Sequence, residues 1–298
     1  MRDFDYEMAT TLEEALVLMS MHEPDIRPMA GGTDLIDHVR NGHLSPERLI
    51  DVKRIRELNV LELDDEGLHL GAAVPCYKIH GHAEIVSRYS ALADSCHIIG
   101  GIQIQSRASA GGNICNSGPA ADATPSVIAL DGVCVIAAPQ FDREVASADF
   151  CTGPGQNVLE PDELLVEIRF PPQPPHSGSH YRRFIPRNEM DIAVVGVGAS
   201  VQLDESGQTF LAARIALGAV GPTPLLASEA AELLVGQPVN DETLSLAAEA
   251  ARRVASPITD MRGTAEYRTH LVGVLTQRVL RHAVARARGE AIEYQPGH

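Results

Sequence analysis

Two pairs of adjacent glycines, far apart along the chain, constrain its fold more than any other feature of the sequence. Gly31-Gly32 stands between a short strand and a helical stretch over 34–40, and Gly111-Gly112 lies in a glycine-rich segment that leads into another helix. Adjacent glycines let the backbone turn sharply and direct its N–H groups toward a bound anion. Taken singly, a plain turn would account for the first pair and a surface loop for the second. Two such pairs in one chain predict a diphosphate site built from both.

The usual charged phosphate-binding motifs are absent from this sequence. Its only lysines, Lys53 and Lys78, do not lie in a P-loop, and no strand is followed by the G-x-G-x-x-G pattern of a Rossmann dinucleotide site. A phosphate ligand must therefore be held mainly by main-chain N–H groups, helix ends and hydroxyls. Such a site suits the diphosphate of a permanently bound cofactor.

The composition excludes several other classes of function. With 24 basic and 40 acidic residues the net charge is −16, so the chain should repel nucleic acid and anionic membrane surfaces. No apolar stretch is long enough for membrane insertion, and the acidic start is unlike a signal or transit peptide, so we expect a cytoplasmic protein. The five cysteines stand singly, and His80-Gly81-His82 lacks a third ligand at helical spacing, so we expect no metal site in this chain.

The pattern of elements predicts an α+β chain in three parts. The boundaries are expected at 1–59, 60–175 and 176–298. The second part opens with a hairpin at Asp64–Gly67, continues with one helix over about 80–99 and an irregular stretch over 100–119, and ends in the linker Pro171–Pro175. In the third part three long strands precede three helices, which is typical of an α+β domain with, here, a three-stranded sheet.

Four motifs occur in an order and spacing that resemble a known family. They are AGGTDL at 30–35, the segment Ser109–Asp122 with its Gly-Gly-Asn and Pro-Ala-Ala-Asp sequences, EPDELLVEIRFP at 160–171, and DMRGTAEYRTHLVGVL at 260–275. Together they resemble the FAD-binding medium subunit of the xanthine dehydrogenase and molybdenum hydroxylase family, over essentially the whole chain. The resemblance implies a two-part FAD-binding fold of the vanillyl-alcohol-oxidase/PCMH type, followed by a C-terminal α+β domain like that of carbon monoxide dehydrogenase flavoproteins.

The resemblance also implies an oxidoreductase activity that is shared among subunits. A medium subunit of this family holds non-covalent FAD and joins a small [2Fe–2S] subunit and a large molybdenum–pterin subunit, so we expect a dimer of heterotrimers. Electrons pass from the clusters through FAD to an external acceptor, which the sequence leaves open between NAD, a quinone, a cytochrome and oxygen. No residue of this chain is expected to act as a catalytic acid or base.

Carried over residue by residue, the resemblance implies cofactor-binding positions in two loops and at three further sites. The first loop comprises Met29, Ala30, Gly31, Gly32, Thr33, Asp34 and Leu35, and the second comprises Ser109, Ala110, Gly111, Gly112 and Asn113. Asp122 matches an acidic residue near the flavin, Leu165 matches an apolar contact to the ring region, and Arg183 stands where many relatives have lysine. Gln105-Ser106 replaces a common Arg-Asn pair, and Ile99 replaces an aromatic residue near the adenine.

The sequence leaves two other functions open. The same fold could serve a self-contained FAD-dependent oxidase or dehydrogenase that binds its own substrate, or a structural subunit that has lost its flavin. The first loop reads GGTD rather than the GGHS of the family's carbon monoxide dehydrogenases, and no cysteine-rich insertion marks a hydroxybenzoyl-CoA reductase. Both observations favour an organic substrate, such as an N-heterocycle or an aldehyde, bound by another subunit.

Overall fold

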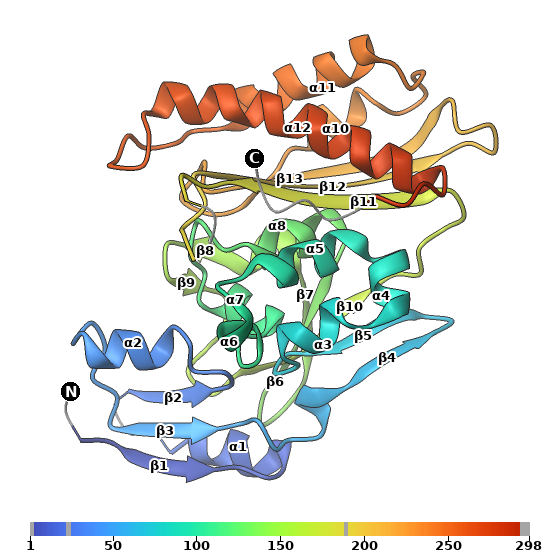
Figure 1. Cartoon of the computed structure of the whole chain (residues 1–298). Coiled ribbons are helices and arrows are strands. Elements are labelled where there is room, and N and C mark those ends of the chain that lie inside the picture. The colour runs from blue at the N-terminus through green and yellow to red at the C-terminus, as the bar shows by residue number, and fades with distance from the viewer. Residues whose placement is uncertain (1–2, 22–24, 188–189, 293–298) are drawn as a thin grey trace.

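The structure is a computed structural model that describes residues 3–21, 25–187 and 190–292 of the 298-residue chain. Within these ranges the strands form four sheets, which contain three, five, four and two strands (Figure 1). The three larger sheets follow one another along the sequence, and helices cover them.

The N-terminal part is a small parallel sheet with two helices. Thr11 caps the first helix, as the sequence predicts, because its hydroxyl accepts a hydrogen bond from the Glu14 N–H at 3.1 Å. The strands run in the order β1-β3-β2, so each helix provides a crossover between parallel strands. The elements are β1 (Asp5–Met8), α1 (Leu12–Met19), β2 (Ile26–Met29), α2 (Leu35–Arg40) and β3 (Arg48–Asp51).

The second sheet is antiparallel, with β10 at its centre between β5 and β6, in the order β4-β5-β10-β6-β7. The predicted hairpin is present, and Gly67 in its turn has a φ of +122°, a backbone conformation that favours glycine. The elements of this region are η1 (Glu57–Asn59), β4 (Leu61–Asp64), β5 (Gly67–Gly71), β6 (Val133–Ala137), β7 (Arg143–Ala146) and β10 (Leu164–Phe170), and β8 (Cys151–Gly153) pairs separately with β9 (Gln156–Asn157).

The helices of the middle region differ from the sequence prediction in two places. The single helix expected over 80–99 is interrupted at Tyr89, whose φ of −119° and ψ of 46° are not helical. This residue is fully buried, and its hydroxyl donates to the Pro171 carbonyl at 3.0 Å, so tertiary packing overrides the local pattern. The stretch over 100–119, expected to be irregular, contains two short helices. The helices are α3 (Cys76–His80), α4 (Ala83–Arg88), α5 (Ser90–Ile98), α6 (Ile102–Gln105), α7 (Ala110–Cys115), α8 (Ala123–Ala129) and α9 (Ser147–Phe150).

The C-terminal sheet has four strands rather than the three that the sequence predicts. The additional strand is the two-residue β14, which pairs with β13 through Ala216 and Leu226 and is too short to show a periodic pattern. Strand β11 forms the other edge, in the order β11-β12-β13-β14. The elements are β11 (Ser177–Phe184), β12 (Val195–Leu203), β13 (Phe210–Gly218), β14 (Leu225–Leu226), α10 (Ser228–Glu232), α11 (Asp241–Val254) and α12 (Ala265–Ala287).

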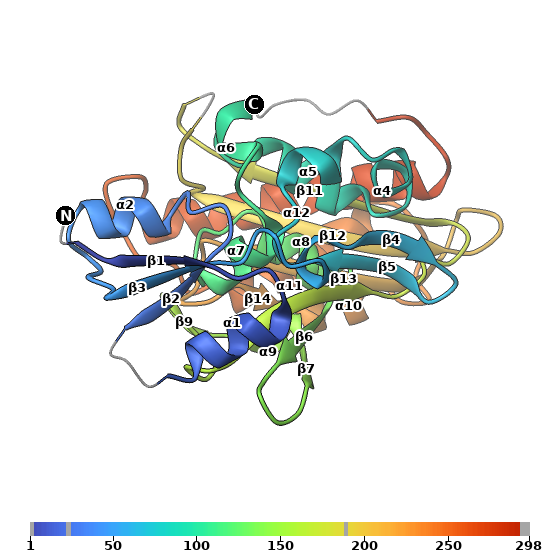
Figure 2. The same ribbon diagram turned by 90° about the horizontal axis from the view of Figure 1, so that it is seen from below.

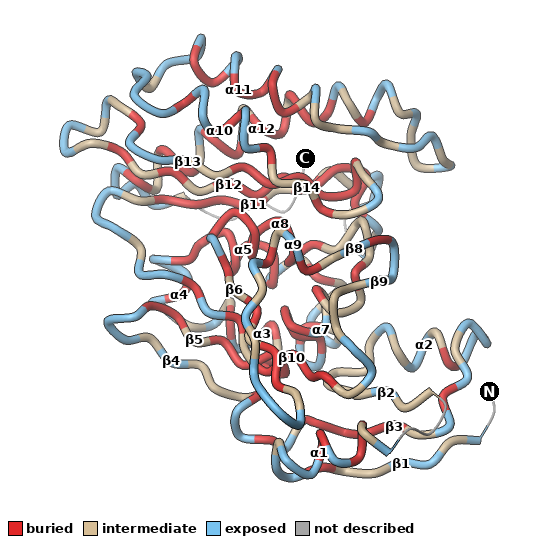
Figure 3. The backbone as a smooth tube through the Cα atoms, turned by 180° about the vertical axis from the view of Figure 1, so that it is seen from behind, coloured by how far each residue is buried: buried red, intermediate tan, exposed pale blue. Residues whose placement is uncertain are grey.

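The C-terminal sheet lies between two layers of helices. The long helix α12 packs on its outer face, whereas α5 and α8 pack on the face toward the rest of the chain (Figure 1). The N-terminal sheet and the β4–β5 hairpin lie on the side of the molecule away from α11 and α12 (Figure 1), and Figure 2 views the molecule from that side. The backbone is most continuously buried where β11, β12, α5 and α8 meet (Figure 3). The middle and C-terminal parts are therefore joined through a buried interface.

Candidate functional site

The two glycine pairs meet in the structure through the chain that precedes the second pair. A Cβ atom placed on Gly31 would lie 2.0 Å from the Arg107 carbonyl oxygen and 3.0 Å from the Ala108 nitrogen. Such distances are possible only because residue 31 has no side chain. The first glycine segment therefore lies directly against the main chain that leads into Ser109, although the two segments are far apart in sequence.

The second glycine segment packs against the chain that follows β5. The Cys76 N–H donates to the Ala108 carbonyl at 2.8 Å, and an isolated bridge pairs residues 75 and 109. A Cβ on Gly111 would lie 2.4 Å from the Ala72 carbonyl oxygen and 2.6 Å from the Ala72 Cβ. Gly111 thus allows α7 to pack directly on the backbone that follows β5.

The other two glycines have different roles. Gly32 has a φ of +71°, a backbone conformation that favours glycine. A Cβ added there would contact the side chains of Met29 and Ile36, so this position does not face open space. Gly112 is exposed, and a Cβ there would meet only the Ser109 hydroxyl oxygen, at 3.1 Å. Of the four glycines, Gly112 therefore presents bare backbone to the exterior, as a cradle for a phosphate group requires.

The polar side chains of the second loop form hydrogen bonds within the protein. The Ser109 hydroxyl accepts from the Gly112 N–H at 3.0 Å and caps α7. The Asn113 side-chain oxygen accepts from the Ala123 N–H at 3.0 Å, at the start of α8. Ser109 thus shapes the loop, and Asn113 connects it to the first residue of α8. Ala110 is buried.

The first loop runs from the end of one strand into a short helix. Met29 ends β2, Ala30 packs against the N-terminal core, and Leu35 begins α2. Thr33 is half-buried, whereas Asp34 is exposed and makes no side-chain capping hydrogen bond. The structure therefore brings the backbone of this loop to the second loop and leaves the Asp34 carboxylate on the surface.

Asp122 and Arg183 form a buried ion pair between the middle and C-terminal parts of the chain. Arg183 Nη1 lies 2.5 Å from Asp122 Oδ2, and Arg183 Nη2 donates to the Ile98 carbonyl at 3.0 Å. The Tyr181 hydroxyl donates to the other carboxylate oxygen at 2.8 Å. Burial raises the pKa of Asp122 to about 6, and the two partners oppose this rise.

Tyr181 also belongs to this group, although no motif of the sequence points to it. The period of a strand could have indicated Tyr181, because residues two apart on β11 share a face and Arg183 is a predicted site residue. Leu165, the predicted apolar contact to the flavin, is not part of the Asp122 group. It is buried on β10, opposite Ile136 of β6, in the same core cluster as Ala110. Its contact with a flavin stays a prediction.

This arrangement fits a cofactor that carries a diphosphate and a polar ring system. Exposed, side-chain-free backbone at Gly112 lies on the helix that follows the meeting point of the two loops, and a buried carboxylate–guanidinium pair lies at the start of α8. In the described part of the chain, no group of three or more His, Cys, Asp or Glu residues could hold a metal ion. The same ranges contain no helix with the length and apolar character needed to cross a bilayer.

Sequence comparisons identify the family of this chain. Residues 2–173 match the FAD binding domain in molybdopterin dehydrogenase, and residues 179–283 match the CO dehydrogenase flavoprotein C-terminal domain. A putative xanthine dehydrogenase FAD-binding subunit of Escherichia coli strain K12 is 33% identical over 293 residues, which cover 97% of this chain and 99% of that protein. The carbon monoxide dehydrogenase medium chain of Afipia carboxidovorans is 31% identical over 285 residues, which cover 96% and 98%.

Solved structures have the same fold. Carbon monoxide dehydrogenase from Hydrogenophaga pseudoflava, in a form that lacks the Mo-pyranopterin moiety, matches with a TM-score of 0.91 and 30% identity over 96% of this chain and 98% of that chain. Quinoline 2-oxidoreductase from Pseudomonas putida 86 matches with a TM-score of 0.88 and 26% identity over the same shares. The expected fold class, oxidoreductase activity and FAD-binding domain are confirmed. The chain belongs to the family of FAD-binding subunits of xanthine dehydrogenase- and carbon monoxide dehydrogenase-type molybdenum hydroxylases.

Proposed function

We propose that this chain holds FAD non-covalently and relays electrons from the [2Fe–2S] clusters of a small partner subunit to an external acceptor. FAD, when bound, supplies the redox chemistry, because its ring system accepts electrons singly or in pairs. The observation that carries the proposal is the meeting of the two glycine segments, with Gly31 packed on Arg107 and Gly112 exposed on the adjoining helix. A large molybdenum–pterin subunit would complete a heterotrimer, two of which would associate in the cytoplasm.

The main chain supplies most of the diphosphate binding in this proposal. The segments 29–35 and 109–113 would direct N–H groups at the phosphate oxygens, and the Thr33 hydroxyl could add a donor. Because Ser109 and Asn113 are held by internal hydrogen bonds, their loop is preorganised before the cofactor arrives. Preorganisation lowers the entropic cost of binding and suits a cofactor that stays bound.

The ring system of FAD would lie toward Asp122, Arg183 and Leu165. The ion pair would set the polarity beside the ring, and Arg183 would keep the positive charge that many relatives supply with lysine. Leu165 would provide the apolar contact from β10. We further propose that 1–59 and 60–175 are the two subdomains of the FAD-binding domain and that 176–298 is the C-terminal domain.

The proposal is tested first by the cofactor content of the purified full chain. We expect a yellow protein with a flavin absorption spectrum, from which acid or heat releases FAD. A colourless chain that also fails to take up added FAD would contradict the proposal and favour the flavin-free structural subunit.

The second test separates an electron-transfer subunit from a self-contained oxidase. We expect the isolated chain to turn over no alcohol or amine, and its flavin to take up electrons from a copurifying [2Fe–2S] protein that has first been chemically reduced. Turnover of a small substrate by the isolated chain would favour the self-contained enzyme instead.

A further inference from the structure

Strand β11 is held along the whole length of α5 by buried polar contacts. The contacts are the Ala91 N–H to the Ser179 hydroxyl oxygen at 3.0 Å, the Tyr181 N–H to Asp94 Oδ2 at 3.2 Å, and Arg183 Nη2 to the Ile98 carbonyl at 3.0 Å. They lie at the start, the middle and the end of α5. Because α5 belongs to the FAD-binding domain and β11 to the C-terminal domain, these contacts fix one domain on the other.

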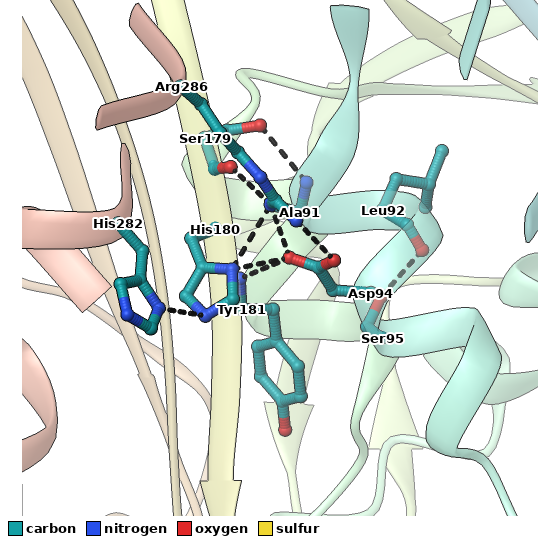
Figure 4. A network of polar contacts seen from close by, with 9 residues as sticks. All are labelled: Ala91, Leu92, Asp94, Ser95, Ser179, His180, Tyr181, His282 and Arg286. Carbon is teal, nitrogen blue, oxygen red and sulfur yellow. Dashed lines mark hydrogen bonds and ion pairs between the residues drawn. The ribbon is translucent and has the colours of Figure 1, made fainter. Parts of the chain in front are cut away.

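Asp94 is the centre of this set (Figure 4). Its side chain is 5% exposed, and it receives two short hydrogen bonds from Arg286, at 2.6 and 2.9 Å, and a contact from His180 Nδ1 at 2.7 Å. Arg286 comes from α12, on the opposite face of the sheet, and its side chain passes the edge strand β11 to reach Asp94 (Figure 4). A Cβ on Gly178 would lie 2.2 Å from the Ala283 carbonyl oxygen, so this glycine allows α12 to lie close enough.

The protonation states in this group are consistent with one another. Burial alone would raise the pKa of Asp94, but the hydrogen bonds from His180 and Arg286 outweigh it and hold the pKa below its ordinary value. Since the ionised carboxylate only accepts, His180 Nδ1 carries the proton of this contact. Arg286 Nη1 lies 3.1 Å from the same nitrogen, but its two hydrogens have acceptors in Asp94 Oδ2 and the Ser179 carbonyl. Burial lowers the pKa of His180, so the ring is neutral and its Nε2 accepts from His282 Nδ1 at 3.0 Å. Asp94 is therefore an anion, and its carboxylate oxygens accept from groups of both β11 and α12.

Tyr181 connects Asp94 to the carboxylate beside the proposed flavin ring. Its N–H donates to Asp94, and its hydroxyl donates to Asp122. The ring is 1% exposed, and a Cβ on Gly196 would lie 2.6 Å from the hydroxyl oxygen, so the side chain has little room to move. Two residues later, Arg183 faces the same side of β11 and binds the other Asp122 oxygen. Any displacement of β11 along α5 would therefore move both partners of Asp122.

We propose that Asp94 is a positioning residue of the FAD site: by fixing β11 on α5, it holds Tyr181 and Arg183 where they orient Asp122 beside the flavin. The inference rests on the proposed function, because it requires Asp122 to face the bound cofactor. Asp94 itself does not touch FAD in this account.

The test is the variant Asp94→Asn in the full chain, titrated with FAD after removal of the cofactor. We expect FAD to bind about tenfold more weakly, which lies within the range of coupling energies between residues of one hydrogen-bond network. We also expect the visible absorption band of the bound flavin to shift. Arg286→Lys, which keeps the positive charge, should restore most of the affinity that Arg286→Gln loses.

Two controls separate positioning from a general loss of stability. Asp241→Asn, at the start of α11, breaks the exposed ion pair with Arg281, which lies on α12 like Arg286. This variant should leave both the dissociation constant and the spectrum unchanged. Val272→Ala removes two buried methyl groups from α12 in the C-terminal core and should lower the unfolding temperature without shifting the flavin spectrum.

The double variant tests the route through Tyr181. If Asp94 acts through this residue, Tyr181→Phe should shift the spectrum by itself, and adding it to Asp94→Asn should cause little further loss of FAD affinity. A folded Asp94→Asn chain with wild-type affinity and spectrum would overturn the inference, and so would an equal spectral shift in Val272→Ala. Should Asp94→Asn fail to fold, an unchanged spectrum in Tyr181→Phe would overturn it. A wild-type chain that binds no FAD would instead refute the proposed function.

Discussion

The two glycines of the second pair should differ in what an alanine substitution changes: FAD affinity at Gly112 and stability at Gly111. At Gly112 an added Cβ meets only the Ser109 hydroxyl oxygen at 3.1 Å, and the backbone there is not in the left-handed region. At Gly111 an added Cβ would lie 2.4 Å from the Ala72 carbonyl oxygen and 2.5 Å from its Cα. We therefore expect Gly112→Ala to fold normally but bind FAD weakly, and Gly111→Ala to lose stability.

The magnitudes follow from these contacts. Alanine stabilises a helix interior by up to about 1 kcal/mol relative to glycine, so the free energy of unfolding of Gly112→Ala should be unchanged or rise slightly. Overpacking against rigid backbone costs about 1–3 kcal/mol, so Gly111→Ala should be destabilised despite the same gain in propensity. If the Gly112 methyl group separates the loop from a phosphate, the loss of one hydrogen bond to a charged group costs about 1.5–3 kcal/mol, or roughly 10- to 150-fold in affinity.

The assay is FAD titration of the cofactor-free chain, followed by flavin fluorescence, together with thermal unfolding without FAD. Each kcal/mol should shift the unfolding midpoint by about 2–4 °C. Gly155→Ala controls for a general effect of the substitution, because an added Cβ on Gly155 has nothing within 4 Å. The φ of +69° at Gly155 makes a small loss of stability expected there. A stable Gly112→Ala chain with unchanged FAD affinity would refute the assignment of this loop to the diphosphate.

Three further outcomes follow from other contacts. Burial, aided by His180, lowers the pKa of His282 from 6.5 to about 4. As the pH drops from 6.5 to 4, His282 is therefore protonated in the unfolded chain before the folded one, and the free energy of unfolding should fall. Denaturant unfolding of His282→Asn should show a weaker pH dependence over this range. Tyr89→Phe removes the hydrogen bond to Pro171 and should cost about 1 kcal/mol in urea unfolding, whereas no loss would discount that bond. Gly178→Ala places a Cβ 2.2 Å from a carbonyl oxygen of α12 and should lower the unfolding temperature by several degrees, and an unchanged midpoint would show that α12 can shift freely.

Elements with a strong local signal were predictable from the sequence. The Thr11 cap, the hairpin closed by Gly67 and the three long C-terminal strands each carry their own turn chemistry or periodic pattern. The break at Tyr89 was not predictable, because it arises from burial of that ring and its hydrogen bond to Pro171, a contact between distant parts of the chain. Strand β14 has only two residues and offers no pattern to detect.

The candidate site was predictable in outline but not in its division of roles. The sequence predicts that the two glycine pairs converge, and the structure brings Gly31 onto the main chain just before Ser109. Which glycine is needed for packing, which for a positive φ and which for open backbone depends on neighbours such as Ala72 that no local motif reveals. Asp94 was not identified for the same reason, since its partners come from β11 and α12, far along the chain.

The most direct test of the central claim is a crystal structure of the full chain with FAD bound. Main-chain N–H groups from both the 29–35 and the 109–113 segments should lie within hydrogen-bond distance of the diphosphate oxygens. A diphosphate held by one segment alone, or bound elsewhere on the chain, would contradict it.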